Sequence, residues 1–160
     1  MAASKSVKPV PEGYHTLTPY LSVKGASDAI AFYKKAFGAE ELYRLPMPDG
    51  RVGHAELQIG DSRLMLADEM PEMGDSITKS PRTLGGATAG FCLYVADADA
   101  LFQRAVDAGA TAKRPLTNQF YGDRSGVVED PFGHLWTIAT HVEDVSPDEL
   151  KRRMASMPLG

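Results

Sequence analysis

Cysteine is almost absent from this sequence: Cys92 is the only one in 160 residues. A single thiol excludes an internal disulfide framework and a zinc site built from several cysteines. The sequence also lacks a run of about 18 apolar residues, so no transmembrane helix is expected. Residues 1–13 are polar and have no apolar stretch of the kind that signal peptides carry. We therefore expect a flexible N-terminal tail in a cytoplasmic protein.

An excess of basic charge is missing too. The chain has 17 Lys and Arg against 21 Asp and Glu, for a formal net charge of −4. No stripe of basic residues offsets this balance, so neither nucleic acid nor a membrane is an expected partner. Hydrophobic residues make up 43% and charged residues 24%, which are ordinary values for a globular protein. A chain of this length buries enough surface to form a core without disulfides or metal ions.

An internal repeat divides the chain into two halves. Residues 51–60 and 124–133 share the frame R-x-G-x-x-E-x-x-φ-G, where φ is Ile59 or Phe132. Upstream, residues 19–23 align with residues 91–95, and in each half a helical pattern and a glycine follow. The alignment places Glu56 and Glu129 at equivalent positions. A repeat that covers strands and a helix predicts two copies of one structural unit.

Each half is predicted to fold as a strand, a helix and three further strands. Alternating residues and turn signals place strands near residues 16–23, 41–45, 52–59 and 63–67, with a helix that Ser27 caps and Gly38 ends. The second half has strands near 89–95, 113–116, 125–129 and 135–139, with a helix capped by Asp97 and ended by Gly109. The two modules therefore span residues 14–67 and 87–141, and the predicted fold class is α+β.

Two segments lie outside the modules. Residues 68–86 are rich in Met, Pro, Gly and Ser and are long for a connection without structure. We expect residues 68–86 to form either a disordered tether or, alternatively, a lid or a dimer arm. Residues 142–160 contain a capping box that starts at Ser146, with Pro147 at the first helical position. This pattern predicts a short amphipathic C-terminal helix that docks on the rest of the protein.

Three stretches carry a resemblance to a known family: a helix with Phe32 and Tyr33, the sequence Phe-Gly-Ala at 37–39, and Asp-Pro-Phe-Gly-His at 130–134. Together with residues 120–124, they make the chain resemble the vicinal oxygen chelate superfamily over residues 16–141, most closely its PhnB-like, glyoxalase/bleomycin-resistance branch. The superfamily includes glyoxalase I, extradiol dioxygenases, fosfomycin-resistance proteins and bleomycin-binding proteins. The resemblance implies two βαβββ repeats that form a curled mixed sheet, a cup, with helices on its outer face. It also implies a homodimer.

Members of that superfamily that use a divalent metal take its ligands from the first and last strands of both units. Carried over to this sequence, the four positions are Thr18, Leu64, Gly90 and Thr137. None of these residues is a good ligand for Zn²⁺, Ni²⁺ or Fe²⁺, and the neighbours Pro19, Met65, Phe91 and Ile138 are no better. We therefore expect no metal at the usual site and no other cofactor, while a metal at a displaced site stays open.

Strand alternation predicts which side chains line the cup. With Leu17, Leu21 and Val23 facing the helix on the first strand, and Ala55, Leu57 and Ile59 on the third, the residues between them face the cup. The cup residues expected to touch a ligand are Thr18, Tyr20, Gln58, Cys92, Tyr94 and Thr137, with Tyr121 and Arg124 at the rim and the candidate acid–base groups His54, Glu56 and Glu129. This mixture suits a small polar or aromatic molecule.

Three functions remain open at this point. In the first, the protein binds a small molecule in its cup without a metal. In the second, it is a lyase or isomerase of the glyoxalase type that uses His54, Glu56 and Glu129, with or without a displaced metal. In the third, it is an interaction module with an empty cup. Either glutamate could instead pair with Arg51 or Arg124. For Arg124, two roles stay open: it binds a carboxylate or phosphate with two hydrogen bonds, or it forms part of a turn with Asp123.

Overall fold

The computed structural model describes residues 7–73 and 78–158. The first module contains β1 (Tyr20–Val23), α1 (Ala26–Phe37), β2 (Glu40–Pro46), β3 (Val52–Ile59) and β4 (Ser62–Asp68). The second contains β5 (Gly90–Tyr94), α3 (Ala98–Ala108), β6 (Thr111–Asn118), β7 (Asp123–Glu129) and β8 (Leu135–His141). Between them lie the 3₁₀ turn η1 (Pro71–Met73) and α2 (Pro81–Leu84), and α4 (Pro147–Ala155) follows the second module.

The two modules have the same sheet topology. The strand order is β1-β4-β3-β2 in the first and β5-β8-β7-β6 in the second. The first and last strands of each module pair in parallel, and the other pairs are antiparallel. The prediction of an α+β fold with two βαβββ modules and mixed sheets is confirmed.

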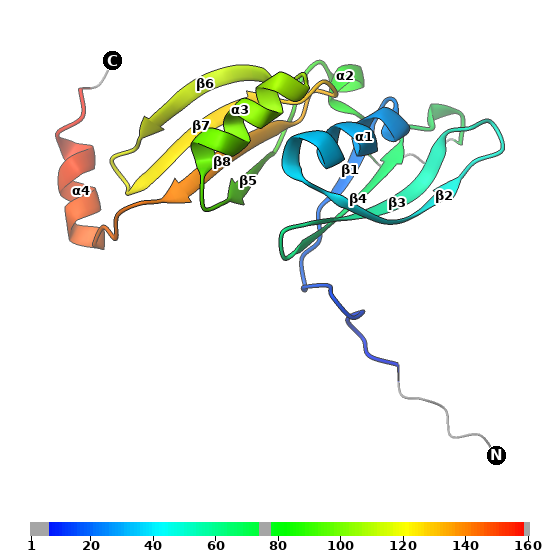
Figure 1. Cartoon of the computed structure of the whole chain (residues 1–160), viewed down its shortest axis with the longest axis horizontal. Coiled ribbons are helices and arrows are strands. Elements are labelled where there is room, and N and C mark those ends of the chain that lie inside the picture. The colour runs from blue at the N-terminus through cyan, green and yellow to red at the C-terminus, as the bar shows by residue number, and fades with distance from the viewer. Residues whose placement is uncertain (1–6, 74–77, 159–160) are drawn as a thin grey trace.

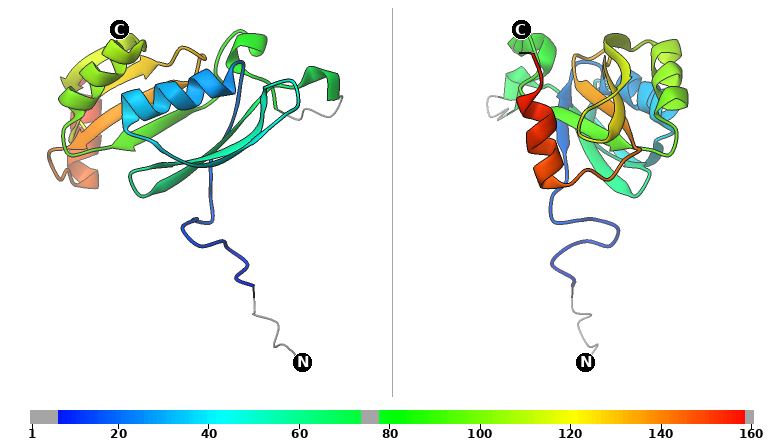
Figure 2. Two further views of the ribbon diagram at one scale, coloured as in Figure 1. Left: turned by 45° about the vertical axis from the view of Figure 1, so that its right-hand side comes forward. Right: turned by 90° about the vertical axis from the view of Figure 1, so that its left-hand side faces the viewer.

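Helices α1 and α3 lie side by side on one face of the two sheets (Figures 1 and 2). Apolar residues at helical spacing explain how α1 binds there, because Ala29, Ile30, Tyr33, Ala36 and Phe37 are all buried. The opposite face of the sheets, which we call the open face, carries the residues that alternate with the buried ones. It corresponds to the cup predicted from the sequence.

Aromatic side chains join the two modules. Phe37 and Tyr33 of α1 lie 4.8 and 5.4 Å from Trp136 of β8, measured between ring centroids, and Phe32 lies 6.3 Å from Phe132. Trp136 is only 2% exposed. Offset and edge-on contacts at these distances add to the free energy gained from burying the rings. The modules therefore share one hydrophobic core.

A buried carboxylate, Asp130, organises the turn between β7 and β8. It accepts hydrogen bonds from the backbone N–H groups of Phe132 and His134, both at 2.9 Å, and from the Trp136 indole at 2.9 Å. The hydroxyl of Tyr33, on α1 of the other module, donates a fourth bond at 2.6 Å. Burial, together with the neighbouring Asp130, raises the pKa of Tyr33 well above its usual value, so this hydroxyl stays a donor. The motif at 130–134 thus links the modules.

The first strand and the first helix cap differ from the sequence prediction. Strand β1 begins at Tyr20 and not near Thr16, and Leu17, predicted to face the helix, is 86% exposed. Pro19 has no N–H to donate, although its carbonyl accepts a bond from Met65, which is consistent with a strand that starts immediately after it.

Helix α1 is capped by a side chain from another strand and not by Ser27. Its N-cap residue is Gly25, with φ of 90°, a conformation that favours glycine. The Asp68 carboxylate, from the end of β4, accepts from the N–H groups of Gly25 and Ala26 at 2.8 and 2.9 Å, and from Val52 at 2.8 Å. The Ser27 hydroxyl instead accepts from Arg44 at 2.9 Å. The caps predicted at Asp97 and Ser146 are confirmed.

The sheet register corrects the predicted equivalence of Glu56 and Glu129. Glu56 pairs with Met65, which pairs with Tyr20. The corresponding row of the second module consists of Val127, Thr137 and Cys92. Glu129 instead lies next to the turn, opposite Leu135, which is the place that Gln58 has opposite Arg63 in the first module. The sequence repeat therefore runs two residues out of step with the sheets, and the β7–β8 turn, which is one residue longer than the β3–β4 turn, accounts for one of the two.

The described part of the linker contacts both modules: α2 lies against β1, and Arg82 reaches the turn between β7 and β8. Ser80 and Thr83 of the α2 turn donate to the Glu69 carboxylate, each at 2.7 Å. Arg82 donates to the carbonyl of Pro131 and lies over the Phe132 ring, 5.8 Å from its centroid. Residues 74–77 of the predicted tether or lid, and residues 1–6 of the predicted tail, fall outside the described residues.

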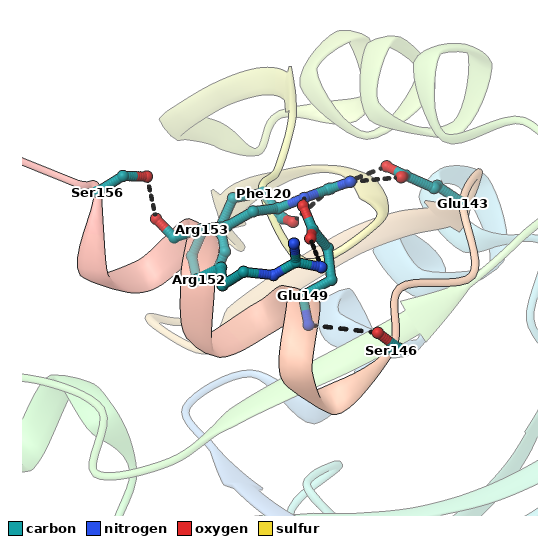
Figure 3. Close-up of polar contacts among 7 residues, drawn as sticks. All are labelled: Phe120, Glu143, Ser146, Glu149, Arg152, Arg153 and Ser156. Atoms are coloured by element: carbon teal, nitrogen blue, oxygen red, sulfur yellow. Dashed lines mark hydrogen bonds and ion pairs between the residues drawn. The ribbon is translucent and has the colours of Figure 1, made fainter.

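Helix α4 lies at the outer end of the second module and is held there by Arg153 (Figures 1 and 3). The Arg153 guanidinium donates to the carbonyl of Phe120 at 2.9 Å, to Glu143 at 2.6 and 3.0 Å, and to Glu149 at 2.9 Å. None of the helix residues is buried. The docking is therefore mainly polar. Among the described residues, no helix is long and apolar enough to cross a membrane.

Candidate functional site

A cleft of about 730 Å³ opens between the two modules. It lies where the start of β4 and the residues before β1 face β5. Aromatic and apolar side chains form much of its wall, with a few polar groups between them. Its lining residues include His15, Thr18, Arg63, Phe91, Cys92, Tyr94 and Trp136. A cleft of this size, with few polar groups, has the properties of a small-molecule site.

A hydrogen-bonded chain of three side chains lies on the open face of the first module. The Tyr20 hydroxyl lies 2.8 Å from His54 Nδ1, and His54 Nε2 lies 3.2 Å from Glu56 Oε1. An ionised carboxylate can only accept, so Nε2 carries the proton and Nδ1 accepts from Tyr20. Burial, with a smaller effect of Tyr43, raises the pKa of Tyr20, so its hydroxyl stays protonated. The three side chains thus form a continuous hydrogen-bonded chain from Tyr20 to Glu56.

The residues before β1 connect this chain to the cleft. Tyr14 donates a hydrogen bond to Glu56, as Tyr43 does at 3.0 Å. The Arg63 guanidinium lies over the Tyr14 ring, 5.5 Å from its centroid, and its Nε donates to the carbonyl of Gly13 at 3.2 Å. Figure 2 shows the segment before β1 extending away from the two sheets. The Glu56 carboxylate therefore has three neighbouring hydrogen-bond partners, the side chains of Tyr14, Tyr43 and His54.

A second polar group lies on the open face of the other module. Tyr94 donates to Asp123 at 2.7 Å, and His141 Nδ1 lies 2.8 Å from the same carboxylate. The hydrogen bond to Asp123 raises the pKa of Tyr94 to about 12. Burial opposes ionisation of Asp123, but the bonds from His141 and Tyr94 outweigh it and lower the pKa of this carboxyl. Burial, followed by the Asp123 charge, raises the pKa of Cys92.

The structure brings together only some of the residues predicted from the sequence. Thr18, Cys92 and Tyr94 line the cleft, and Thr137 is the strand partner of Cys92. His54, Glu56 and Tyr20 form the chain described above. Glu129 lies apart from it: its ion-pair partner in the described part of the protein is Lys113, at 3.3 Å.

Three other predicted residues are engaged elsewhere. Arg124 points to the helix-covered side, where it forms a two-pronged ion pair with Asp99 of α3, both bonds at 2.6 Å. Gln58 donates to the carbonyl of Gly60 at 2.7 Å. Tyr121 shares a 3.3 Å hydrogen bond with Ser125. Neither glutamate pairs with the Arg51 or Arg124 guanidinium in the described part of the chain, and Arg51 pairs with Asp49 and Glu72.

Arg63 is the main site residue that the sequence reasoning missed. The carried-over family position on this strand is Leu64, but Leu64 is 4% exposed and faces the helices. The neighbours on either side, Arg63 and Met65, lie on the open face. The alternation of buried Leu64 and Leu66 with partly exposed residues was a signal that could have identified Arg63.

The residues at the family's usual metal positions do not fit a divalent metal. Leu64 faces the core, Gly90 has no side chain, and Thr18 and Thr137 offer hydroxyl groups where the family uses imidazole or carboxylate groups. Across residues 7–73 and 78–158, no three His, Cys, Asp or Glu side chains lie close enough together to hold a metal ion. His54 and Glu56 alone supply only two donors.

Two βαβββ modules that pair the first and last strands in parallel define the glyoxalase fold. Residues 14–138 match the Glyoxalase/Bleomycin resistance protein/Dioxygenase superfamily, and the chain belongs to this family.

Several proteins are similar to this chain. An uncharacterized protein of Mycobacterium bovis is 47% identical over 140 residues, which cover 88% of this chain and 92% of that protein. Protein YjdN of Escherichia coli is 36% identical, over 76% of this chain and 92% of its own length. Among solved structures, TioX from Micromonospora sp. ML1 is 29% identical with a TM-score of 0.62, over 80% of this chain and 99% of TioX.

Proposed function

We propose that this protein binds a small polar or aromatic molecule in the cleft between its modules, without a metal at the family's usual site, and that it belongs to the PhnB-like branch of the family. The observation that carries the proposal is the cleft of about 730 Å³, in which Phe91, packed on the buried Trp136, lies beside the polar groups of Thr18, Cys92 and Tyr94. Aromatic walls bury a ring, and a few hydrogen-bonding groups orient it.

A thermal-shift screen of small organic molecules, carried out in EDTA, tests this proposal. A ligand at about 100 times its Kd stabilises a folded protein by about 2.7 kcal/mol, which raises the Tm measurably. We expect saturable stabilisation in the chelator by aromatic or polar molecules. Stabilisation that requires added Ni²⁺, Zn²⁺, Fe²⁺ or Mn²⁺, or stoichiometric metal in protein purified without a chelator or a histidine tag, would contradict the metal-free site.

The second candidate is a lyase or isomerase of the glyoxalase type. The chain from Tyr20 through His54 to Glu56 favours it, because such a relay can move a proton to or from a bound molecule. Glu129 has no part in this relay. For this candidate, deuterium exchange from solvent into a bound carbonyl compound should be lost in His54→Gln, whereas the variant should still bind the compound. Exchange that is equal in both proteins would exclude the relay.

We also propose that the protein is a homodimer. The support is the family resemblance. Light scattering should give about twice the 17.3 kDa mass of one chain. A monomer at every accessible concentration would contradict this state.

A further inference from the structure

The Arg63 guanidinium has a nitrogen, Nη1, that donates no hydrogen bond to any described residue. Its Nε donates to the carbonyl of Gly13, but its Nη1 is buried and has no partner. It is the only such side-chain nitrogen or oxygen in the described part of the chain. No described carboxylate forms an ion pair with Arg63. A buried N–H of a charged group without an acceptor is costly, so this position is suited to a ligand that brings an acceptor.

Arg63 is one of the residues that line the cleft. Among the described lining residues, Arg63 has the only permanent positive charge, and Asp61 has the only carboxylate. Asp61 accepts a hydrogen bond from Ser62 at 3.0 Å. The partly exposed ring of Phe91, which packs on the buried Trp136 with 5.0 Å between ring centroids, belongs to the same cleft. The cleft thus combines an unpaired cation with a surface that binds rings.

We propose that Arg63 binds the carboxylate of an aromatic acid whose ring packs against Phe91. This inference rests on the proposed small-molecule function and specifies its ligand class. The planar guanidinium offers parallel N–H donors that match the two oxygens of a carboxylate, and its charge strengthens both bonds. An isosteric neutral amide would fill the same space and offer only one acceptor oxygen.

The residues before β1 cover the Arg63 guanidinium. The Gly13 carbonyl accepts from Nε and the Tyr14 ring lies over the guanidinium, while Nη1 has no partner among the described residues. Gly13 has φ of +80°, and a Cβ at this position would collide with the guanidinium. The close approach of backbone to Arg63 therefore depends on glycine. This segment holds the guanidinium in place and leaves Nη1 without an acceptor of its own.

Calorimetric titration with naphthoate and with naphthamide tests the inference. The two probes share a ring system and differ in charge, so the difference between their affinities measures the contribution of the carboxylate. A charged hydrogen bond should favour naphthoate by about tenfold or more in the full-length protein. In Arg63→Gln this preference should disappear, while Arg63→Lys should keep an intermediate preference.

Arg152→Gln serves as the matched control, because this arginine lies on α4 and is exposed, and its ion-pair partner among the described residues is Glu149. It should keep the full preference for naphthoate, and circular dichroism should show that all variants are folded. Equal affinity of the wild-type protein for the two probes, or an unchanged preference in Arg63→Gln, overturns the inference and leaves the proposed function standing. Failure of both probes and of every molecule in the thermal-shift screen overturns the two together.

Discussion

At the scale of single residues, the open face contains side chains that are held by hydrogen bonds and not free in solvent. His141 is an example: Nδ1 lies 2.8 Å from Asp123 and Nε2 lies 2.9 Å from Asp144. Two carboxylates can each accept a bond only if both ring nitrogens carry a proton. The bond to Asp123, and then the bond to Asp144, raise the pKa of His141, so folding favours its protonated form.

This raised pKa predicts how stability depends on pH. A group whose pKa is higher in the folded state adds stability that is fully present below its unfolded pKa of about 6.5, and that is lost as the pH rises through its folded pKa. The Tm difference between the wild-type protein and His141→Gln should therefore be largest at about pH 6 and should shrink at higher pH. His15→Gln, at an exposed position, is the control. A difference that does not change with pH would contradict the ion pairing.

The raised pKa of Cys92 predicts low reactivity. Cys92 is exposed, but the partial desolvation of its thiol and the neighbouring Asp123 both disfavour the thiolate, which is the form that reacts with alkylating agents. Iodoacetamide should label Cys92 more slowly than a free cysteine at the same pH, and Asp123→Asn should accelerate the reaction. Labelling by mass spectrometry measures both rates. A wild-type rate equal to that of free cysteine would disprove the effect of this environment.

At the scale of elements, alternation and capping signals predicted much of the fold. The buried Ala55 and Leu57 and the partly exposed His54 and Glu56 follow the predicted parity of β3, because each strand has only one face toward the helices. What failed depended on contacts from elsewhere in the chain. The cap of α1 comes from Asp68, 42 residues from Ala26, and no local pattern at Ser27 could have indicated it.

The candidate site was predicted less completely for the same reason. The chain from Tyr20 to Glu56 follows from strand parity, but the cleft forms only when the modules meet. The partnerless nitrogen of Arg63 depends on how Gly13 and Tyr14 cross it, and neither residue belongs to a strand. The predicted equivalence of Glu56 and Glu129 was wrong because the sequence repeat and the sheet register differ by two residues at this strand, in part because the turn of the second module is longer.

The Asp68 cap yields a prediction about α1. Replacing Asp68 with Ala leaves the N–H groups of Gly25, Ala26 and Val52 without their acceptor, which should lower the free energy of unfolding by about 2 kcal/mol or more. Urea denaturation measures the change. Asp28→Ala, in the exposed first turn of the same helix, is the matched control. A loss no larger than that of the control would show that the cap contributes little.

At the scale of the whole molecule, the modules share one core and should unfold together. Asp130 holds the β7–β8 turn and accepts from Tyr33 of the other module. In Asp130→Ala, buried donors from both modules lose their acceptor, at a cost of roughly 3 kcal/mol or more. The variant should have a much lower Tm, and far-ultraviolet and tryptophan signals should still change together. Asp107→Ala, on the surface of α3, should behave like the wild type.

Two separate transitions in the wild-type protein would contradict this picture, because they would mean that each module has its own core. A small loss of stability in Asp130→Ala would mean that water satisfies the donors once the carboxylate is removed.

The bond between Tyr33 and Asp130 also has a consequence for synthesis on the ribosome. All strands of the first sheet are made before the linker is, yet the acceptor for Tyr33 follows 97 residues later. At typical elongation rates this interval lasts roughly 5–20 s. During that time the nascent first module exposes the aromatic face of Phe32, Tyr33 and Phe37, a natural substrate for a chaperone. A ribosome-bound chain that ends before Asp130 should therefore bind a hydrophobic dye that the complete protein does not bind.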